Sequence, residues 1–256
     1  MTDRITAQPS RVREWTRSAI QFALVLGVLT AAKLAIAEPY YVPSGSMEPT
    51  LLIGDELLAT KYSYGYSAAS LPVSIVLPPT RRILDAMPVR GDIVVFRAPS
   101  DPRQIWVKRV VGLPGDRVAM KDGQLWVNGE KVALRSGGIG EMEMENGSIV
   151  PAPRYIETLP GGHEHAILKT ANGGPLDNIA ETVVPTGHLF VMGDNRDNSA
   201  DSRVPVADGG VGMLPTANLV GRVNTVVGSW DLGMADRPIW TWPSGLRLSR
   251  FFASVH

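Results

Sequence analysis

A long apolar segment near the N-terminus constrains this chain more than any other feature. Residues 18–37 are almost wholly apolar, and the interruptions are Gln21, Thr30 and Lys33. At about 1.5 Å per residue, about 20 helical residues span the roughly 30 Å hydrocarbon layer of a bilayer. Four arginines precede this segment, and basic flanks favour the cytoplasmic side. The sequence therefore predicts a cytoplasmic segment over residues 1–17, a transmembrane anchor over residues 18–37 and an extracytoplasmic domain over residues 38–256.

The same segment also fits a second interpretation, a cleavable signal peptide. Basic residues, an apolar run and the small-x-small ending Ala35-Ile36-Ala37 follow that pattern. Residues 40–42 lead straight into the serine-containing turn described below. This continuity favours a retained anchor, which would hold the turn close to the membrane.

Beyond residue 51 the apolar pattern changes to that of β-strands. We expect strands over residues 55–66, 92–96, 105–111, 117–132, 188–192 and 219–229. Asp122-Gly123 and Asn128-Gly129 are strong signals of tight hairpin turns. Residues 68–89 and 136–187 are rich in proline or glycine, so we expect loop-rich insertions there, either loops or a small inserted subdomain laid on the core. The predicted fold is mainly β, preceded by a single helix.

Composition excludes several kinds of site. The chain has no cysteine, so neither a thiol nucleophile nor a disulfide is available. Its 25 acidic and 25 basic residues balance, which gives no charge argument for a nucleic-acid partner. His163 and His165 flank Glu164 among glycines, and we interpret this stretch as a solvated loop rather than a zinc site.

A constrained turn directly after the apolar segment carries the first candidate for chemistry. Its sequence is Pro43-Ser44-Gly45-Ser46-Met47-Glu48-Pro49-Thr50-Leu51. Glycine and prolines can hold a serine where its hydroxyl is exposed and where neighbouring N–H groups point outward at an anion. A nucleophile with an oxyanion site requires this arrangement, although the same composition is common in ordinary turns.

A serine nucleophile needs a base, and no histidine of this sequence lies in a recognisable catalytic setting. A lysine can serve if it is neutral, but at a pKa of about 10.4 only about one in 2,500 is neutral at pH 7. Burial among apolar side chains lowers a lysine pKa by up to about 3 to 5 units. Lys108 lies among apolar residues of a predicted strand, which makes it the candidate base. The alternative is an exposed strand position beside Arg109.

Three blocks of this sequence resemble the signature blocks of bacterial type I signal peptidases, membrane-anchored Ser/Lys endopeptidases that remove signal peptides from exported proteins. The first block is Gly45 to Leu51. The second is Arg90 to Phe96, followed by Val107 to Asp116. The third is Gly193 to Arg203. The blocks follow the order that the family has, and with the anchor they account for the layout of the chain.

The resemblance implies a role for each matching residue. Ser46 would be the nucleophile and Lys108 the general base, with Ser44 and the Ser46 N–H forming the oxyanion hole. Ser199 would orient the lysine by a hydrogen bond. The charged residues of the third block would support the site: Asp201 and Arg203 as a pair, and Asp194 and Arg196 in neighbouring structural roles.

The resemblance also implies what the site binds and where it acts. Shallow apolar pockets would accept small residues at the positions one and three before the cut, lined by Tyr40, Val42, Met47, Leu51, Trp106 and Val107. No metal or organic cofactor is required. The expected partners are signal peptides of preproteins, the lipid bilayer and, functionally, the secretion translocon. The expected location is the bacterial cytoplasmic membrane, with a single span and the catalytic domain on the periplasmic face.

Three alternative functions can be compared with this one by the sequence features that each requires. A penicillin-binding-type acyltransferase needs a Ser-x-x-Lys helix, and no lysine here follows a serine by three residues. A self-cleaving repressor would carry a DNA-binding domain where this chain has its apolar segment. A tethered β domain that binds export partners without catalysis is the main alternative, and it predicts that Ser46 and Lys108 are replaceable.

Overall fold

The computed structural model describes residues 11–71, 77, 78, 80–144, 147–170, 173–234 and 237–255, and within the N-terminal helix it describes the side chains of residues 14–28 and 36. The chain divides into two compact units, Met1–Ile36 and Ala37–His256. Each unit is described below by itself.

The first unit contains helix α1, Arg11–Ile36. Its described apolar side chains, such as Trp15 and Phe22, are exposed. Among the described residues, no helix meets both the length and the apolarity that crossing a membrane requires. Much of the predicted anchor, residues 29–35, and most of the predicted cytoplasmic segment, residues 1–10, lie outside the described side chains.

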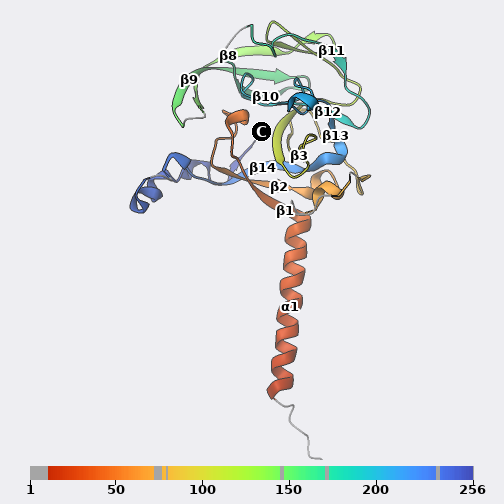
Figure 1. Cartoon of the computed structure of the whole chain (residues 1–256), viewed down its shortest axis with the longest axis vertical. Helices are drawn as coiled ribbons and strands as arrows, with labels where there is room; N and C mark the ends of the chain where they lie inside the picture. Colours follow the sequence, from red (N-terminus) through yellow and green to blue (C-terminus); the bar gives the residue numbers. More distant parts are fainter. Residues whose placement is uncertain are drawn as a thin grey trace, which may run out of the picture. The chain divides into compact units, whose positions relative to one another are not determined.

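The second unit is built on one large antiparallel sheet (Figure 1). Its strands run in the order β1 (Ala37–Tyr41), β2 (Asp55–Thr60), β14 (Leu219–Ser229), β3 (Ile93–Arg97), β4 (Ile105–Gly112), β12 (His188–Met192) and β13 (Leu214–Pro215), and β15 (Ala253–Ser254) pairs with β14. The prediction of a mainly β domain is therefore confirmed. The strand expected over residues 55–66 is shorter than predicted, because the chain turns into a 3-10 helix at Lys61.

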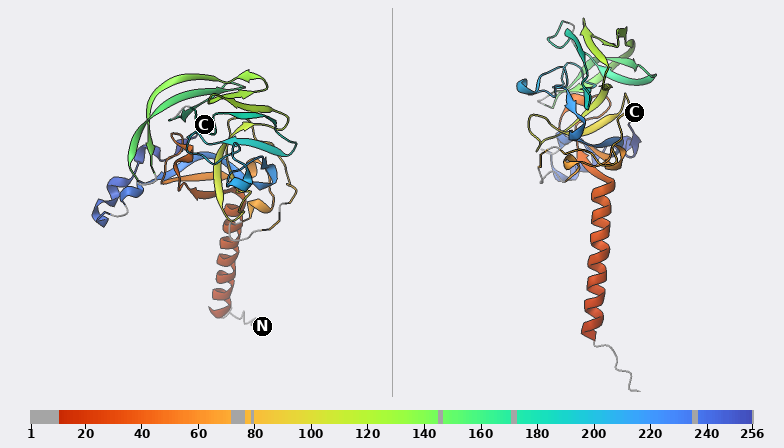
Figure 2. Two further views of the ribbon diagram at one scale, coloured as in Figure 1. Left: turned by 45° about the horizontal axis from the view of Figure 1, so that its top comes forward. Right: turned by 90° about the vertical axis from the view of Figure 1, so that its right-hand side faces the viewer.

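Two smaller antiparallel sheets complete the unit, and the longest strands of one form a curved ribbon (Figure 2). One sheet has the order β10 (His163–Leu168), β9 (Ile149–Leu159) and β8 (Ala133–Glu143). The other has the order β11 (Ile179–Val183), β5 (Arg117–Lys121), β6 (Gln124–Val127) and β7 (Glu130–Lys131). Short 3-10 helices connect the strands: η1 (Gly45–Met47), η2 (Lys61–Ser63), η3 (Ala68–Ser70), η4 (Val206–Asp208), η5 (Thr216–Asn218), η6 (Leu232–Met234), η7 (Ile239–Gly245) and η8 (Leu248–Arg250).

Residues 136–187 form strands rather than loops, since this stretch contains most of β8 and all of β9, β10 and β11. Of the two alternatives for this stretch, the loops are wrong and the small inserted subdomain agrees with the structure. Its glycines and prolines are accommodated within strands. The register of β8 against β9 shifts between Ser136 and Ile139, where two glycines lie. Pro151 and Pro153 pair with β8, while β10 pairs with β9 only from Arg154 onward. The prolines therefore lie where β9 does not pair with β10, and the ladder needs no N–H donor on that side of β9.

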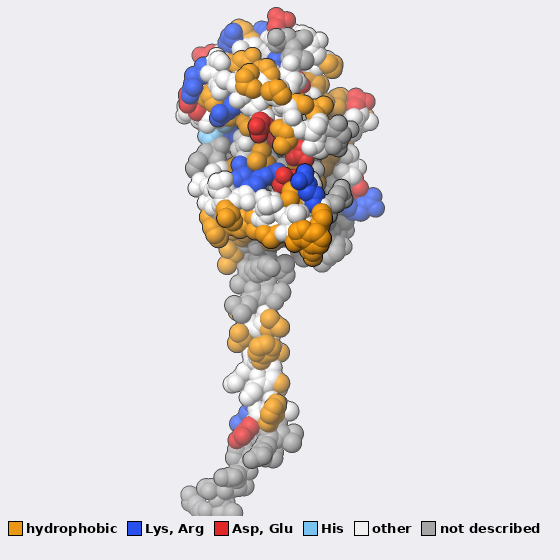
Figure 3. Space-filling view, turned by 90° about the vertical axis from the view of Figure 1, so that its left-hand side faces the viewer, with side chains coloured by type: hydrophobic (Ala, Val, Ile, Leu, Met, Phe, Trp, Pro, Cys, Tyr) orange, Lys and Arg blue, Asp and Glu red, His pale blue; other side chains and the backbone are white. Residues whose placement is uncertain are grey.

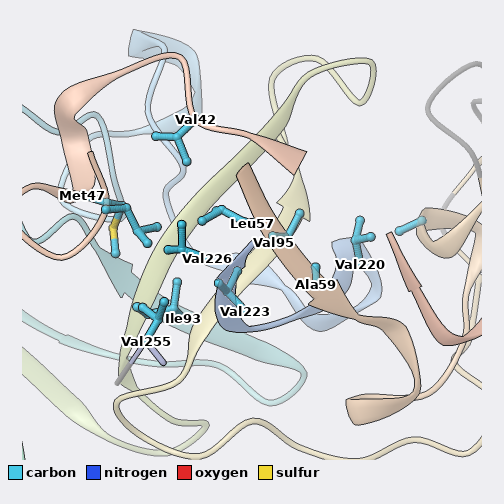
Figure 4. Close-up of a cluster of buried hydrophobic side chains, with 12 residues drawn as sticks. Val42, Met47, Leu57, Ala59, Ile93, Val95, Val220, Val223, Val226 and Val255 are labelled. Atoms are coloured by element: carbon cyan, nitrogen blue, oxygen red, sulfur yellow. The ribbon is translucent and has the colours of Figure 1, made fainter. Parts of the chain in front are cut away.

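One buried apolar cluster lies directly beneath the serine-containing turn (Figure 4). Most of its members come from β2, β3, β14 and the turn, and the others are Val42 before the turn, Ala69 of η3 and Val255 after β15. The full set is Val42, Met47, Leu51, Leu57, Ala59, Ala69, Ile93, Val95, Val220, Val223, Val226 and Val255. Met47 and Leu51 have no exposed surface. The turn is thus fixed to the large sheet by its own apolar side chains.

Acidic and basic side chains are intermixed on the face of this unit that Figure 3 shows. This agrees with the equal numbers of acidic and basic residues in the sequence.

Candidate active site

Ser46 lies in the middle of η1, a single turn held at both ends. Ser44, before the turn, has an extended backbone with φ −138° and ψ 151°. After it, the N–H of Glu48 donates to the carbonyl of Gly45 at 3.1 Å, and the N–H of Leu51 donates to that of Met47 at 2.9 Å. Because Met47 is buried and Ser46 is half-buried, the turn directs the serine toward the surface.

Lys108 reaches this turn from strand β4. Its backbone is opposite Val94 of β3, and its side chain is only 4% exposed. Lys108 Nζ donates a hydrogen bond to Ser46 Oγ at 2.8 Å and a second one to the carbonyl of Val107 at 3.1 Å. Residues that are 62 positions apart in the sequence therefore meet at hydrogen-bond distance.

Burial lowers the pKa of Lys108 to about 8, although the carboxylates of Asp201 and Asp194 act in the opposite direction. At that pKa about one lysine in ten is neutral at pH 7, compared with about one in 2,500 for a free lysine. A neutral amine at 2.8 Å from a serine hydroxyl can accept its proton. The pair has both the geometry and the protonation behaviour of a nucleophile and its base.

A cleft of about 580 Å³ opens beside the pair. Its lining includes four of the predicted substrate-binding residues: Tyr40, Val42, Trp106 and Val107. Ser44, Ser46 and Lys108 also line it. Met47 and Leu51, predicted to line the pockets, are not among the lining residues, because their side chains point into the buried cluster under the turn.

Ser44 and Ser199 have different surroundings. Ser44 is exposed, and its side chain does not cap the 3-10 turn. Ser199 is 7% exposed, and its hydroxyl has no hydrogen-bond partner among the described residues. The predicted hydrogen bond from Ser199 to Lys108 is therefore not formed. A Cβ added to Gly193 would lie 2.3 Å from Ser199 Oγ and 2.4 Å from the carbonyl oxygen of Ser46, which places Ser199 close to Ser46.

The predicted pair of Asp201 and Arg203 is present and buried. Arg203 Nε and Nη2 donate to the two oxygens of Asp201 at 2.9 and 2.8 Å. Asp201 also accepts from the N–H of Gly193 at 3.0 Å, and Arg203 donates to the carbonyl of Arg196 at 2.6 Å. The pair thus holds together the loop that follows β12.

Asp194 and Arg196 each pair with a residue that was not among the predicted site residues. Asp194 accepts two hydrogen bonds from Arg109, and Arg196 Nη1 donates to Glu157 Oε1 at 2.8 Å. Arg109 follows Lys108 directly, so alternation along β4 could have indicated that it points to the opposite side of the sheet. Glu157 lies in β9, within the stretch that was interpreted as loops.

His163 and His165 belong to strand β10, so the interpretation of this stretch as a solvated loop is wrong. His165 is 5% exposed, and burial lowers its pKa to about 2. It lies 3.4 Å from a Glu157 oxygen and 3.8 Å from an Asp194 oxygen. Within the described part of the chain, no group of histidines and carboxylates is arranged to hold a metal ion.

Several known proteins that are similar to this chain belong to one family. The family described as signal peptidase, peptidase S26, matches residues 12–230. A signal peptidase I of Pseudomonas aeruginosa is 41% identical over 223 residues, covering 85% of this chain and 74% of the relative. A signal peptidase I of Rickettsia typhi is 34% identical over 251 residues, covering 92% of each. A crystal structure of a signal peptidase I from Enterococcus faecalis is 25% identical, with a TM-score of 0.32, and covers 54% of this chain and 97% of that chain.

Proposed function

This chain belongs to the signal peptidase family, peptidase S26, and is a peptidase; from that premise we propose that it removes N-terminal signal peptides from exported preproteins with Ser46 as nucleophile and Lys108 as general base. The observation that carries the proposal is the 2.8 Å contact between Lys108 Nζ and Ser46 Oγ at the wall of the cleft. The lowered pKa of this lysine supports it.

In the proposed mechanism, neutral Lys108 takes the proton of Ser46 as the serine oxygen attacks the scissile carbonyl. The ammonium of Lys108 then gives a proton to the leaving amine, and an acyl-enzyme remains on Ser46. Water attacks the ester with Lys108 again as base, which releases the signal peptide and restores the free serine. Each proton that Lys108 accepts is returned within the cycle.

The tetrahedral intermediate places a negative charge on the former carbonyl oxygen. We expect Ser44 and the Ser46 N–H to donate hydrogen bonds to it. The exposure of the Ser44 side chain, its position in the cleft lining and its lack of a capping role support this assignment.

The substrate is expected to bind as an extended strand along the cleft, between the ends of β1 and β4. The apolar cleft residues Tyr40, Val42, Trp106 and Val107 would contact the side chains one and three positions before the cut. A narrow apolar lining favours alanine and other small residues there. Main-chain hydrogen bonds would supply affinity, and the pockets would supply selectivity.

The proposed location is the bacterial cytoplasmic membrane, with residues 18–37 as a single anchor and the β unit on the periplasmic face. The apolar run, its basic flank and a helix over Arg11–Ile36 support this location. Preproteins would reach the site as they leave the secretion translocon. Alkaline carbonate extraction and protease accessibility in spheroplasts test it, since a soluble full-length protein would contradict the anchor.

The test of the activity is cleavage of a model preprotein by the purified full chain in detergent. Wild type should cut after a small-x-small site, as judged by N-terminal sequencing of the product. Ser46→Ala and Lys108→Ala should lose cleavage while keeping the wild-type circular dichroism spectrum. A folded Lys108→Ala variant that cuts as well as wild type would remove the proposed base and favour the non-catalytic, tethered binding domain.

A further inference from the structure

A buried carboxyl group lies against the catalytic turn without a salt bridge. Glu48 is two residues after the nucleophile and is 2% exposed. Its side chain folds back over the turn, since a Cβ added to Gly45 would lie 2.8 Å from Glu48 Oε2. No arginine or lysine among the described residues forms a salt bridge with it. An ionised carboxylate in such a place is costly, because its charge is neither hydrated nor paired.

The hydrogen bonds of Glu48 connect it to two other parts of the fold. Its two oxygens accept from the N–H of Glu143, at the end of β8, at 3.2 and 3.4 Å. Its Oε2 is also 3.5 Å from Nδ2 of Asn195, in the loop after β12. The carboxyl group therefore lies where the turn, β8 and this loop meet.

Asn195 in turn supports the backbone of the nucleophile. Its N–H donates to the carbonyl of Ser46 at 3.1 Å, and its Nδ2 donates to the carbonyl of Gly45 at 3.1 Å. Asn195 has no exposed surface. A displacement of the Glu48 side chain would therefore move the amide that orients the Ser46 peptide.

We propose that Glu48 is a positioning residue for the nucleophile: through Asn195 and the strand β8, its carboxyl group fixes the turn that presents Ser46 to Lys108. The inference rests on the proposed function, because it needs a reaction at Ser46. Glu48 does not line the cleft, so its effect should appear in kcat and not in KM.

The groups around Glu48 determine when it ionises. Burial raises its pKa to about 7. The hydrogen bond from the backbone N–H of Glu143 lowers this pKa, whereas the negative charge of the Glu143 side chain raises it. The hydrogen bond from Asn195 and the charge of Arg247, between η7 and η8, lower it as well. Glu48 therefore gains its charge as the pH rises through about 7, and the charged form is the one that Glu143 repels.

The test compares Glu48→Gln, which keeps an uncharged side chain of the same shape, with Glu48→Ala. For Glu48→Ala we expect kcat to fall about tenfold or more with KM within about twofold of wild type, as for a misplaced nucleophile. Glu48→Gln should retain activity near that of wild type at pH 6. The matched control is Glu141→Gln, which changes an exposed carboxylate of β8, the strand whose Glu143 N–H contacts Glu48.

The pH dependence separates positioning from a merely structural role. The ratio of wild-type kcat to Glu48→Gln kcat should fall about threefold or more between pH 6 and pH 9, and the titration of Lys108 cancels from this ratio. Glu143→Gln should move the fall to lower pH, because it removes a charge that favours the uncharged form of Glu48. A constant ratio, an unchanged kcat in Glu48→Ala, or a folded but inactive Glu48→Gln would overturn the proposal.

Wild type and Ser46→Ala are run in parallel. If wild type does not cleave, the proposed function and this inference both fail. If wild type cleaves and Ser46→Ala does not, but the Glu48 variants lack the expected change in kcat or in its pH dependence, the inference alone fails.

Discussion

Arg109 and Asp194 form a buried ion pair beside the Ser46–Lys108 dyad, with two hydrogen bonds of 2.9 and 2.7 Å between guanidinium and carboxylate. Asp194 Oδ2 also accepts from the hydroxyl of Thr50 at 2.5 Å. Arg109 follows Lys108 on β4, and Thr50 lies four residues after Ser46. The carboxylate of Asp194 thus connects the strand that carries Lys108 to the turn that carries Ser46, and it fixes the distance between them.

Replacement of Asp194 by Asn should destabilise the protein strongly. Removing one partner of a buried pair leaves an uncompensated charge, here on Arg109, and typically costs about 3 to 5 kcal/mol. Urea unfolding of the full chain measures the loss. The matched control is Asp101→Asn, which breaks the exposed pair with Arg103 and should leave the unfolding midpoint unchanged. Equal midpoints for both variants would show that the buried pair does not stabilise the site.

The cleavage rate should depend on pH through Lys108. Burial lowers the pKa of this lysine to about 8, and only its neutral form can accept the serine proton. As the pH falls below that value the neutral fraction decreases, so single-turnover rates should fall about tenfold for each pH unit lost below about pH 7. A rate that is flat between pH 5 and pH 7 would contradict a lysine base.

Lys108→Arg gives a complementary test of the same assignment. An arginine remains protonated at all pH values that the fold tolerates, since its pKa is above about 12. The variant keeps the positive charge and should fold, but it should not cleave at pH 9, where Lys108 of wild type is mostly neutral. Intact-mass measurement of trapped acyl-enzyme distinguishes loss of the first step from loss of the second.

Roles for Ser46 and Lys108 could be predicted from sequence because three blocks resemble those of the family, and each residue also has a local signal. Ser46 lies on a turn whose prolines and glycine are visible in the sequence, and Lys108 lies in a run of apolar strand residues. Neither signal indicates that the two side chains meet. Their proximity depends on the pairing of β4 in the large sheet and on the burial of Met47, and both of these are tertiary properties.

The charged network and the roles of Met47 and Leu51 were harder to predict. Glu157 and His165 face inward from β9 and β10, but the glycines and prolines around them resemble those of a loop. Only the pairing of these strands shows that the residues are buried. Met47 and Leu51 lie in a matching motif, yet a motif does not tell which of its apolar residues face the substrate and which face the core.

Met47 and Val107 should respond differently to truncation. Met47 is fully buried under the turn, so Met47→Ala should cost about 2 to 5 kcal/mol of stability and reduce cleavage of all substrates alike. Val107 lines the cleft, so Val107→Ala should change stability less and should instead relax selectivity at the position before the cut. Thermal unfolding and competition between preproteins with Ala or Val at that position measure the two effects. A change of selectivity in Met47→Ala would instead show that Met47 contacts the substrate.

Gly193 should tolerate no side chain, although it takes no part in the chemistry. An added Cβ would lie 2.4 Å from the carbonyl oxygen of Ser46, which is backbone and cannot rotate away. Gly193→Ala must therefore displace the nucleophile or the loop after β12, and a misplacement of about 1 Å can cost about 100-fold in rate. Removal of the Ser199 hydroxyl should not rescue the variant, because the clash with the Ser46 carbonyl remains. Gly174→Ala is the matched control, since a Cβ there meets nothing within 4 Å. Steady-state kcat of both variants tests the argument, and a kcat in Gly193→Ala equal to that of the control would show that the turn can move without loss of activity.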